Sequence, residues 1–208
     1  MPGKLVRKPD VAVDVKMNAL LINCRSLSSK LTSLSDNFKT NKATMALLTE
    51  TWFNKGNKKI SHDLNILDQR DNIRFIRRDR NTRGGGVAIA FDHSIIDLKK
   101  MSLKSLHKSG FEILVGQGKL NGNKKKQLVF ACYIPPSYST KQNRDFFDTL
   151  TDAISETQSI VPDAWITLCG DWNGRSLSEI MRLFPDIVEV MSPPTSCLLY
   201  TSPSPRDS

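Results

Sequence analysis

Residues 111–134, FEILVGQGKLNGNKKKQLVFACYI, contain two apolar runs separated by an Asn-Gly turn sequence. Asn121 and Gly122 readily adopt the positive φ angles of tight two-residue turns. The stretch therefore predicts a β-hairpin whose arms, 111–120 and 127–134, pair antiparallel. Antiparallel strands in the middle of the chain argue against a doubly wound parallel sheet and favour an α+β fold.

For the chain before this hairpin, the sequence predicts four strands, with one helix between the first two strands. Ser26 and Ser28 are the expected caps of that helix, because leucines and a phenylalanine recur at helical spacing as far as residue 38. A helical crossover predicts that the two strands beside it are parallel. Residues 60–72 show no strong periodicity. The strands are predicted at residues 16–23, 43–49, 73–77 and 87–91.

The chain after the hairpin alternates helix and strand. An amphipathic helix of roughly 20 residues is predicted to begin near Ser139. A buried strand at 164–169, a short helix at 176–184 that ends before Pro185, and a further strand at 187–190 follow it. Strands and hairpins covered by helices predict a layered sandwich.

Composition is that of one folded domain. The chain has 208 residues, of which 39% are hydrophobic and 25% charged, and domains commonly have about 100–200 residues. No apolar run approaches the roughly 20 residues of a membrane-spanning helix, so we expect an intracellular, soluble protein with no membrane partner. The four cysteines are scattered, which favours buried thiols over a disulfide framework or a zinc site.

Charge is distributed unevenly along the chain. Residues 1–126 carry 25 Lys plus Arg against 11 Asp plus Glu, or +14, whereas residues 127–208 carry 5 against 10, or −5. Arginines cluster at positions 74, 77, 78, 80 and 83. A basic cluster of this kind suits a polyanion such as nucleic acid, although a solvated, solubilising surface is an equal alternative.

Polar side chains interrupt the apolar pattern where three predicted strands end. Asn23 ends the first strand, Glu50 the second, and Asp171 with Asn173 the strand at 164–169. Polar groups at strand ends often share a crevice, and carboxylates with amides form an oxygen-rich site that suits Mg²⁺ or Mn²⁺. Each residue alone also fits an ordinary turn.

Five short motifs occur in one order along the chain. They are NCRSL at 23–27 followed by Lys30, LTETW at 48–52, RGGGVA at 83–88, YIPP at 133–136 and GDWN at 170–173. Together they resemble the endonuclease/exonuclease/phosphatase superfamily, and most closely the apurinic-endonuclease-like domain of non-LTR retrotransposons. The resemblance spans about residues 16–195. It implies a DNase I-like, four-layered α/β/β/α sandwich.

The resemblance also implies roles for the polar residues. Glu50 corresponds to the carboxylate that holds a divalent metal, Mg²⁺ or Mn²⁺, and Asn23 to the amide that supports the metal and its water. Asp171 corresponds to the group that orients or deprotonates the attacking water, and Asn173 to an amide that contacts the phosphate. Tyr133 matches a tyrosine whose hydroxyl faces the scissile phosphate, although a buried tyrosine at a strand end is the simpler alternative.

The implied activity is the nicking of double-stranded DNA by water, which leaves a 5′-phosphate and a 3′-hydroxyl. In retroelements that 3′ end primes synthesis by a covalently linked reverse transcriptase. Two alternatives stay open: a phosphatase of the same superfamily, and a non-catalytic nucleic-acid-binding module that keeps the fold.

The chain departs from this family at its C-terminal end. The family continues with an Asp and then an Asp-His pair, yet no histidine follows His107. From Cys197 the sequence resembles a translated sequencing adapter, with a natural Ser/Pro-rich tail as the alternative. We therefore expect a flexible segment at 1–14, a truncated domain at 15–195 and a disordered, non-native tail at 196–208. A truncated domain is expected to be inactive and marginally stable, with one sheet edge open to water.

Overall fold

The strands form two four-stranded sheets that pack face to face. The computed structural model describes residues 17–184, except for 55, 57, 81–83 and 108. The first sheet has the order β1-β2-β4-β3 and the second β5-β6-β7-β8. Their bounds are β1 Ala19–Asn23, β2 Met45–Thr49, β3 Ile73–Arg78, β4 Val87–Asp92, β5 Ile96–Lys100, β6 Glu112–Leu120, β7 Lys126–Tyr133 and β8 Trp165–Asp171.

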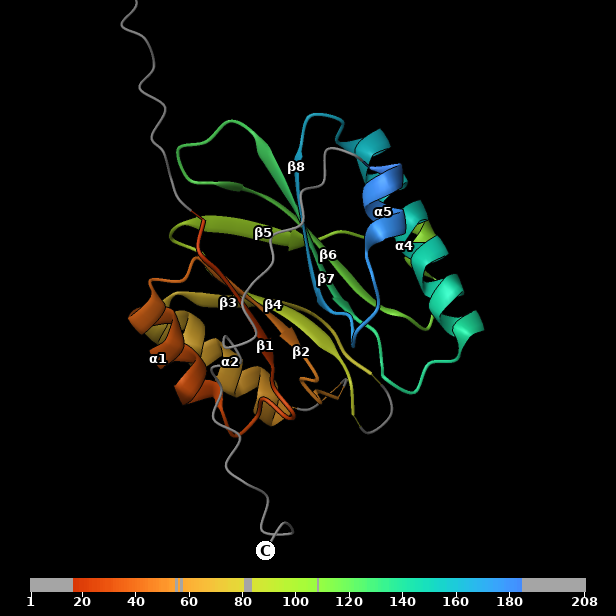
Figure 1. Ribbon diagram of the computed structural model, residues 1–208. Helices are drawn as coiled ribbons and strands as arrows, with labels where there is room; N and C mark the ends of the chain where they lie inside the picture. The colour runs from red at the N-terminus through yellow and green to blue at the C-terminus, as the bar shows by residue number, and fades with distance from the viewer. Residues whose placement is uncertain (1–16, 55, 57, 81–83, 108, 185–208) are drawn as a thin grey trace, which may run out of the picture.

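The helices cover the outer face of each sheet (Figure 1). They are α1 Leu31–Asn41, α2 Lys58–Asp71, α3 Lys104–His107, α4 Thr140–Ile160 and α5 Ser178–Leu183. One apolar layer lies between α1, α2 and the first sheet, a second between the two sheets, and a third between the second sheet and the remaining helices. The predicted α+β fold, an α/β/β/α sandwich, is confirmed. Its incompleteness at the C-terminus stays a prediction.

The central hairpin has the predicted antiparallel pairing. β6 pairs with β7 from Glu112 opposite Tyr133 to Lys119 opposite Lys126. The connection spans residues 121–125, close to the gap of 121–126 between the predicted arms. Gly122 has φ +81°, and the Asn121 backbone N–H donates to the Ile95 carbonyl at the start of β5. The hairpin end is thus joined to the neighbouring strand as well as to itself.

The N-terminal half differs from the prediction in three elements. α1 begins at Leu31 after Lys30, and no side chain caps it, so Ser26 and Ser28 are not its caps. A full helix, α2, lies where the sequence shows weak periodicity, and it buries Ile60 and Leu67. β5 lies in a stretch for which no strand is predicted. The parallel pairing of β1 with β2 agrees with the helical crossover between them.

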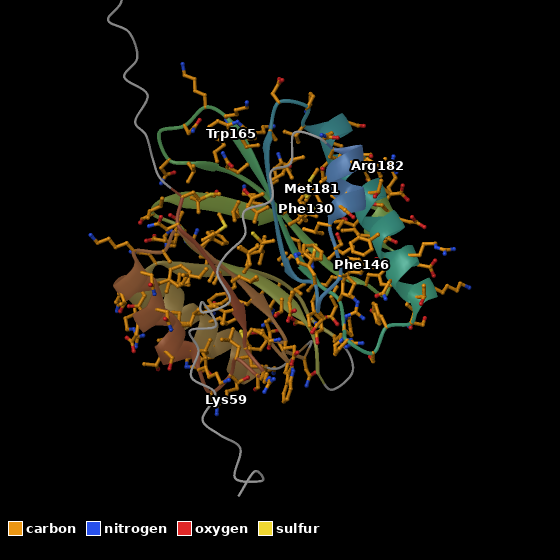
Figure 2. The ribbon with its side chains drawn as sticks, in the orientation of Figure 1. Lys59, Phe130, Phe146, Trp165, Met181 and Arg182 are labelled. Carbon is orange, nitrogen blue, oxygen red and sulfur yellow. The ribbon has the colours of Figure 1, made fainter. Side chains whose placement is uncertain are left out.

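α4 begins where the sequence predicts. The Ser139 hydroxyl accepts from the Gln142 backbone N–H, and the Gln142 side chain accepts from the Ser139 N–H, which forms a complete capping box. Phe146 on α4 and Phe130 on β7 are both buried in the layer between this helix and the second sheet (Figure 2). This packing fixes the positions of β7 and β8, and therefore of the loops at their ends.

Two large apolar side chains are exposed where the sheets end at β1 and β8. Leu21 is 44% exposed, although it lies beside Leu47 on the face that turns toward the other sheet. Trp165 is 50% exposed, and the Lys125 ammonium lies 5.1 Å from its ring centroid (Figure 2). Of the cysteines, Cys24 and Cys132 are buried free thiols.

The expected flexible segment at 1–14, the strand at 187–190, Cys197 and the tail at 196–208 lie outside the described residues. Among the described residues, no helix combines the length and the apolar character needed to cross a membrane.

A buried carboxylate joins α1 to α2. The Asp71 side chain is 4% exposed and pairs with Lys39 at 2.8 Å and with Arg70 at 2.7 Å, and it accepts a hydrogen bond from Ser35. Burial alone would raise the pKa of Asp71. The hydrogen bonds from Arg70, Lys39 and Ser35 outweigh burial and lower this pKa from 3.8 to about 2. Its charged form therefore stabilises the folded protein.

Replacing Asp71 with Asn is expected to lower the free energy of unfolding by about 1–2 kcal/mol at pH 7, because its partners are exposed and screened. Since the folded pKa is depressed, this stability is present above about pH 4 and is lost as pH falls toward 2. Urea unfolding at pH 7 and pH 3 measures both effects, with the exposed Asp36→Asn as control. An equal loss for the two variants would contradict the assignment.

Candidate functional site

Three polar residues from separate strand ends meet at one amide group. The Asn23 Nδ2 donates to Glu50 Oε1 at 3.0 Å and to Asp171 Oδ2 at 2.9 Å. Asn23 ends β1, Glu50 follows β2, and Asp171 ends β8 in the other sheet. Because both parallel pairs end at the same side of the sandwich, residues 148 positions apart in sequence come into contact.

Tyr133, at the end of β7, belongs to the same group. Its hydroxyl donates to Glu50 Oε1 at 2.9 Å, and its side chain is buried. Burial, and then the hydrogen bond to Glu50, raise the pKa of Tyr133 well above its ordinary value. The phenol therefore stays protonated and acts as a donor. Glu50 Oε1 accepts from both Asn23 and Tyr133, which orients the carboxylate and leaves Oε2 for another partner.

The Asn23 oxygen is the atom that most clearly lacks a partner. Both described contacts of its amide are made by the nitrogen, and Oδ1 is buried with no hydrogen-bond partner among the described residues. A buried acceptor without a donor is costly, and a cation would satisfy it. Carboxylate and amide oxygens are the ligands that Mg²⁺ prefers. The residues present therefore fit a divalent metal.

The protein supplies few charged ligands to such a metal. Within the described part of the chain, no three His, Cys, Asp or Glu side chains form a cluster that could hold a metal ion. Glu50 and Asp171 are the two carboxylates at the site, and Asn23 adds a neutral oxygen. Mg²⁺ commonly keeps several waters and takes one or two carboxylates, so this donor set suits Mg²⁺ better than Zn²⁺.

Asn173 lies beside Asp171 in the loop after β8. Its backbone N–H donates to Asp171 Oδ1 at 3.3 Å, and its side-chain Nδ2 donates to the Ile134 carbonyl at 2.8 Å. Arg175 holds the loop from the other side by donating to the carbonyls of Asn173 and Pro136. These bonds tie the loop to the segment that follows Tyr133, so Asn173 stands next to the group formed by the other four residues.

Strained backbone conformations concentrate at this end of the sandwich. Of seven non-glycine residues with positive φ in the described chain, five lie in these loops: Arg25, Ser26, Glu50, Trp52 and Asn173. A left-handed conformation costs a non-glycine residue about 1–2 kcal/mol. Backbone hydrogen bonds between the loops hold these conformations. The Ser26 N–H donates to the Glu50 carbonyl at 2.9 Å, and the Trp52 N–H donates to the Gly85 carbonyl at 2.9 Å. Strain of this kind is typical of functional sites.

Glu112 and Arg80 also lie close to the site; the sequence pointed to Arg80 only as one of the clustered arginines and to Glu112 not at all. Glu112 stands opposite Tyr133 in the β6–β7 register and is buried. Its Oε2 accepts from the Gly86 N–H at 2.6 Å, and Arg80 Nη1 lies 3.2 Å from its Oε1. Burial raises the pKa of Glu112, although Arg80 and Gly86 oppose that effect. The sequence signal that could have identified Glu112 is a carboxylate at the start of the apolar run 112–115.

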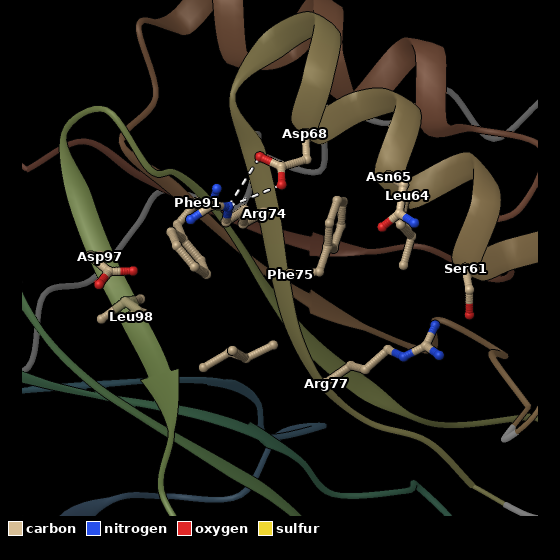
Figure 3. Close-up of a pocket in the computed structure, with 11 residues that line it drawn as sticks. Ser61, Leu64, Asn65, Asp68, Arg74, Phe75, Arg77, Phe91, Asp97 and Leu98 are labelled. Carbon is tan, nitrogen blue, oxygen red and sulfur yellow. Dashed lines mark hydrogen bonds and ion pairs between the residues drawn. The ribbon is translucent and has the colours of Figure 1, made fainter.

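A groove of about 400 Å³ lies elsewhere, at the β3 edge of the first sheet (Figure 3). Asp68 on α2 and Arg74 on β3 form an ion pair at 3.0 Å across it. Asp97 of β5 lines the opposite wall. The groove contains none of the residues that meet around Asn23.

Comparisons with known proteins bear on the fold. No protein-family model matches the chain, and no curated protein matches it. Solved structures do match, and the three described here share 14–19% of their residues with this chain. A D. rerio TDP2 complexed with single-strand DNA product matches with a TM-score of 0.56, 14% identity, and coverage of 80% of this chain and 64% of that one.

One archaeal and one bacterial structure match to a similar degree. An AP endonuclease from Archaeoglobus fulgidus has a TM-score of 0.54 at 19% identity and covers 80% of this chain and 63% of its own. The 3′ phosphatase NExo from Neisseria, bound to a product DNA hairpin, has a TM-score of 0.53 at 16% identity and covers 76% and 58%. This chain thus spans about three fifths of the length of these proteins. Together with the observed layers, the likenesses establish a DNase I-like fold.

Proposed function

We propose that this chain is a metal-dependent phosphodiester hydrolase, the DNA-nicking endonuclease domain of a non-LTR retroelement whose reverse transcriptase is covalently linked. The observation that carries the proposal is the Asn23 amide, which contacts Glu50 and Asp171 through its nitrogen and leaves a buried oxygen without a partner. The solved structures of similar fold include proteins bound to DNA products, which supports DNA as the substrate.

The retroelement assignment rests on the five motifs, which occur in the order found in that family. Its other support is the excess of positive charge in residues 1–126, because a basic surface attracts the DNA backbone. The proposed domain spans residues 15–195, and residues 196–208 are proposed to be foreign to it.

Each residue has a proposed part in hydrolysis. Glu50 and the Asn23 oxygen would hold Mg²⁺ or Mn²⁺, which when bound withdraws charge from the phosphoryl oxygens. Asp171, ionised, accepts a proton from the attacking water as the new O–P bond forms. The bond from phosphorus to the 3′ oxygen breaks, and that oxygen takes a proton from solvent. Tyr133 orients Glu50, and Asn173 donates to the phosphate.

The test combines metal binding with plasmid nicking. The 208-residue chain is expected to bind Mn²⁺ by titration calorimetry. Asp171→Asn is expected to weaken this binding, because it removes a negative charge beside the two metal ligands. A second version, in which the natural reading frame replaces residues 196–208, is expected to convert supercoiled plasmid to open circles with Mg²⁺ and not with EDTA. Asp171→Asn should slow nicking by about 10²–10³-fold. The exposed Asp148→Asn on α4 serves as the matched control.

The same assay separates the two alternatives. A phosphatase, the activity for which the Neisseria protein of similar fold is named, would release phosphate from a 3′-phosphorylated oligonucleotide and leave the plasmid supercoiled. A binding module would bind DNA in a salt-dependent manner and would cleave it in neither version. Either result would overturn the proposed endonuclease.

A further inference from the structure

The ion pair between the buried Glu112 and the partly exposed Arg80 has no part in the mechanism above. Glu112 is 2% exposed, and one of its oxygens accepts from the Gly86 N–H. The other, Oε1, is 3.2 Å from Arg80 Nη1 but lacks hydrogen-bond geometry to any described residue. A carboxylate that is buried in this way seldom stabilises a fold more than an apolar side chain would. Glu112 is therefore placed to hold the Arg80 guanidinium in position.

The position of Arg80 follows from its contact with Gly85. A Cβ atom on Gly85 would lie 2.7 Å from both Cδ and Nη1 of Arg80, so the side chain passes directly over that glycine. The Gly85 carbonyl in turn accepts from the Trp52 N–H, two residues after Glu50. The guanidinium therefore lies beside Gly85 and Glu112, and Glu112 stands opposite Tyr133 in the β6–β7 register. The Arg80 side chain remains 37% exposed.

The other described arginines of this cluster are engaged elsewhere. Arg78 donates to the backbone carbonyls of residues 106, 109 and 113, which makes it a structural residue. Arg77 pairs with Asp79 and lies over the Phe53 ring, and Arg74 pairs with Asp68 at the distant groove. Among the described residues, Arg80 donates no hydrogen bond of good geometry. Its side chain is partly exposed, so N–H groups stay accessible to a partner outside the chain.

We propose that Arg80, held by Glu112, binds a DNA phosphate next to the one that is cleaved. The inference rests on the proposed function for its substrate class. A guanidinium is charged at every physiological pH and binds two phosphate oxygens through parallel N–H groups. Anchoring by Glu112 reduces the side-chain entropy lost when DNA binds, so Arg80 is the binding residue and Glu112 its positioning residue.

The test measures binding of a fluorescent 20-base-pair duplex to the 208-residue chain in EDTA, by anisotropy over a range of salt concentrations. Arg80→Ala is expected to weaken binding about 10-fold at low salt and to reduce the slope of log K against log salt by about 0.9, the value for one phosphate contact. Arg80→Lys should restore most of the slope but not all of the affinity. Arg74→Ala removes the same charge at the distant groove and should leave the slope unchanged.

A double-mutant cycle tests the part of Glu112. Glu112→Gln should weaken binding about threefold in the original chain and should not weaken it in the Arg80→Ala background, because Glu112 acts through Arg80. Equal weakening in both backgrounds would assign Glu112 to the fold alone. A thermal melt of each variant identifies any that unfold, and Arg80→Lys, which keeps the ion pair, remains informative if Glu112→Gln does not fold.

The outcomes distinguish this inference from the proposed function. If Arg80→Ala changes the slope while neither version of the protein nicks plasmid, the phosphate contact stands and the hydrolase fails. If the protein nicks plasmid while Arg80→Ala and Arg74→Ala behave alike in slope and affinity, the phosphate contact is overturned and the hydrolase stands.

Discussion

Replacing Glu50 with Gln is expected to abolish measurable Mn²⁺ binding and to lower Mg²⁺-dependent nicking by about 10³-fold, equivalent to about 4 kcal/mol. The Gln side chain can keep its oxygen toward the Asn23 amide and the Tyr133 hydroxyl, which both donate to Glu50 Oε1. Its nitrogen then takes the position of Oε2. A donor without charge would replace the oxygen that is free to bind a cation.

The structural cost of this substitution is expected to be small, because both hydrogen bonds to Oε1 can persist. The melting temperature should therefore stay within a few degrees, and circular dichroism provides that comparison. Asp148→Asn removes a carboxylate from the exposed face of α4 and should change neither metal binding nor nicking. If Glu50→Gln retained full Mn²⁺ affinity, the metal would have to bind elsewhere and the assignment of the site would be wrong.

Gly118→Ala is expected to cause the largest loss of stability, about 3 kcal/mol or more in the free energy of unfolding. Gly118 lies in β6 opposite Leu98 of β5. A Cβ atom here would overlap the backbone carbonyl oxygen of Asp97 and would lie 2.8 Å from its carbon. Because the obstacle is backbone, β5 would have to move away from β6 and break ladder hydrogen bonds.

Gly110→Ala is the matched control for this substitution. Gly110 is exposed, its φ is not in the left-handed region, and a Cβ atom there would meet nothing within 4 Å. We expect it to change the free energy of unfolding by less than about 0.5 kcal/mol. Urea unfolding followed by circular dichroism measures both variants, and a similar value for the two would refute the predicted clash at β5.

The elements that the sequence predicted well have strong local signals. α4 has a capping residue, a long amphipathic pattern and a proline pair before it, and the structure begins it at Thr140. α2 was missed because its buried face comprises only Ile60 and Leu67 in an otherwise polar stretch. β5 was missed because its five residues bury only Ile96 and Leu98. α2 forms because the first sheet offers an apolar surface for it to cover, and β5 forms because it pairs with β6 and buries its two apolar side chains between the sheets.

For the polar group around Asn23 too, the residues with a clear local pattern were the ones that the sequence indicated. Polar residues at the ends of apolar strands indicated Asn23, Glu50 and Asp171, and the structure brings all three together. The same pattern indicated Asn173, whereas Tyr133 was named through family resemblance alone, and the structure places both beside that group. Their catalytic roles stay predictions.

Arg80 and Glu112 could not be paired in advance, because 32 positions separate them and each alone fits an ordinary surface or strand residue. Strand, helix and hairpin preferences depend on neighbours within a few positions, so they could be predicted from the sequence. The contacts between Asn23 and Asp171, and between Arg80 and Glu112, depend instead on how the two sheets pack and in which register β6 meets β7. Such packing is a property of the assembled core, since burial of many distant side chains at once selects it.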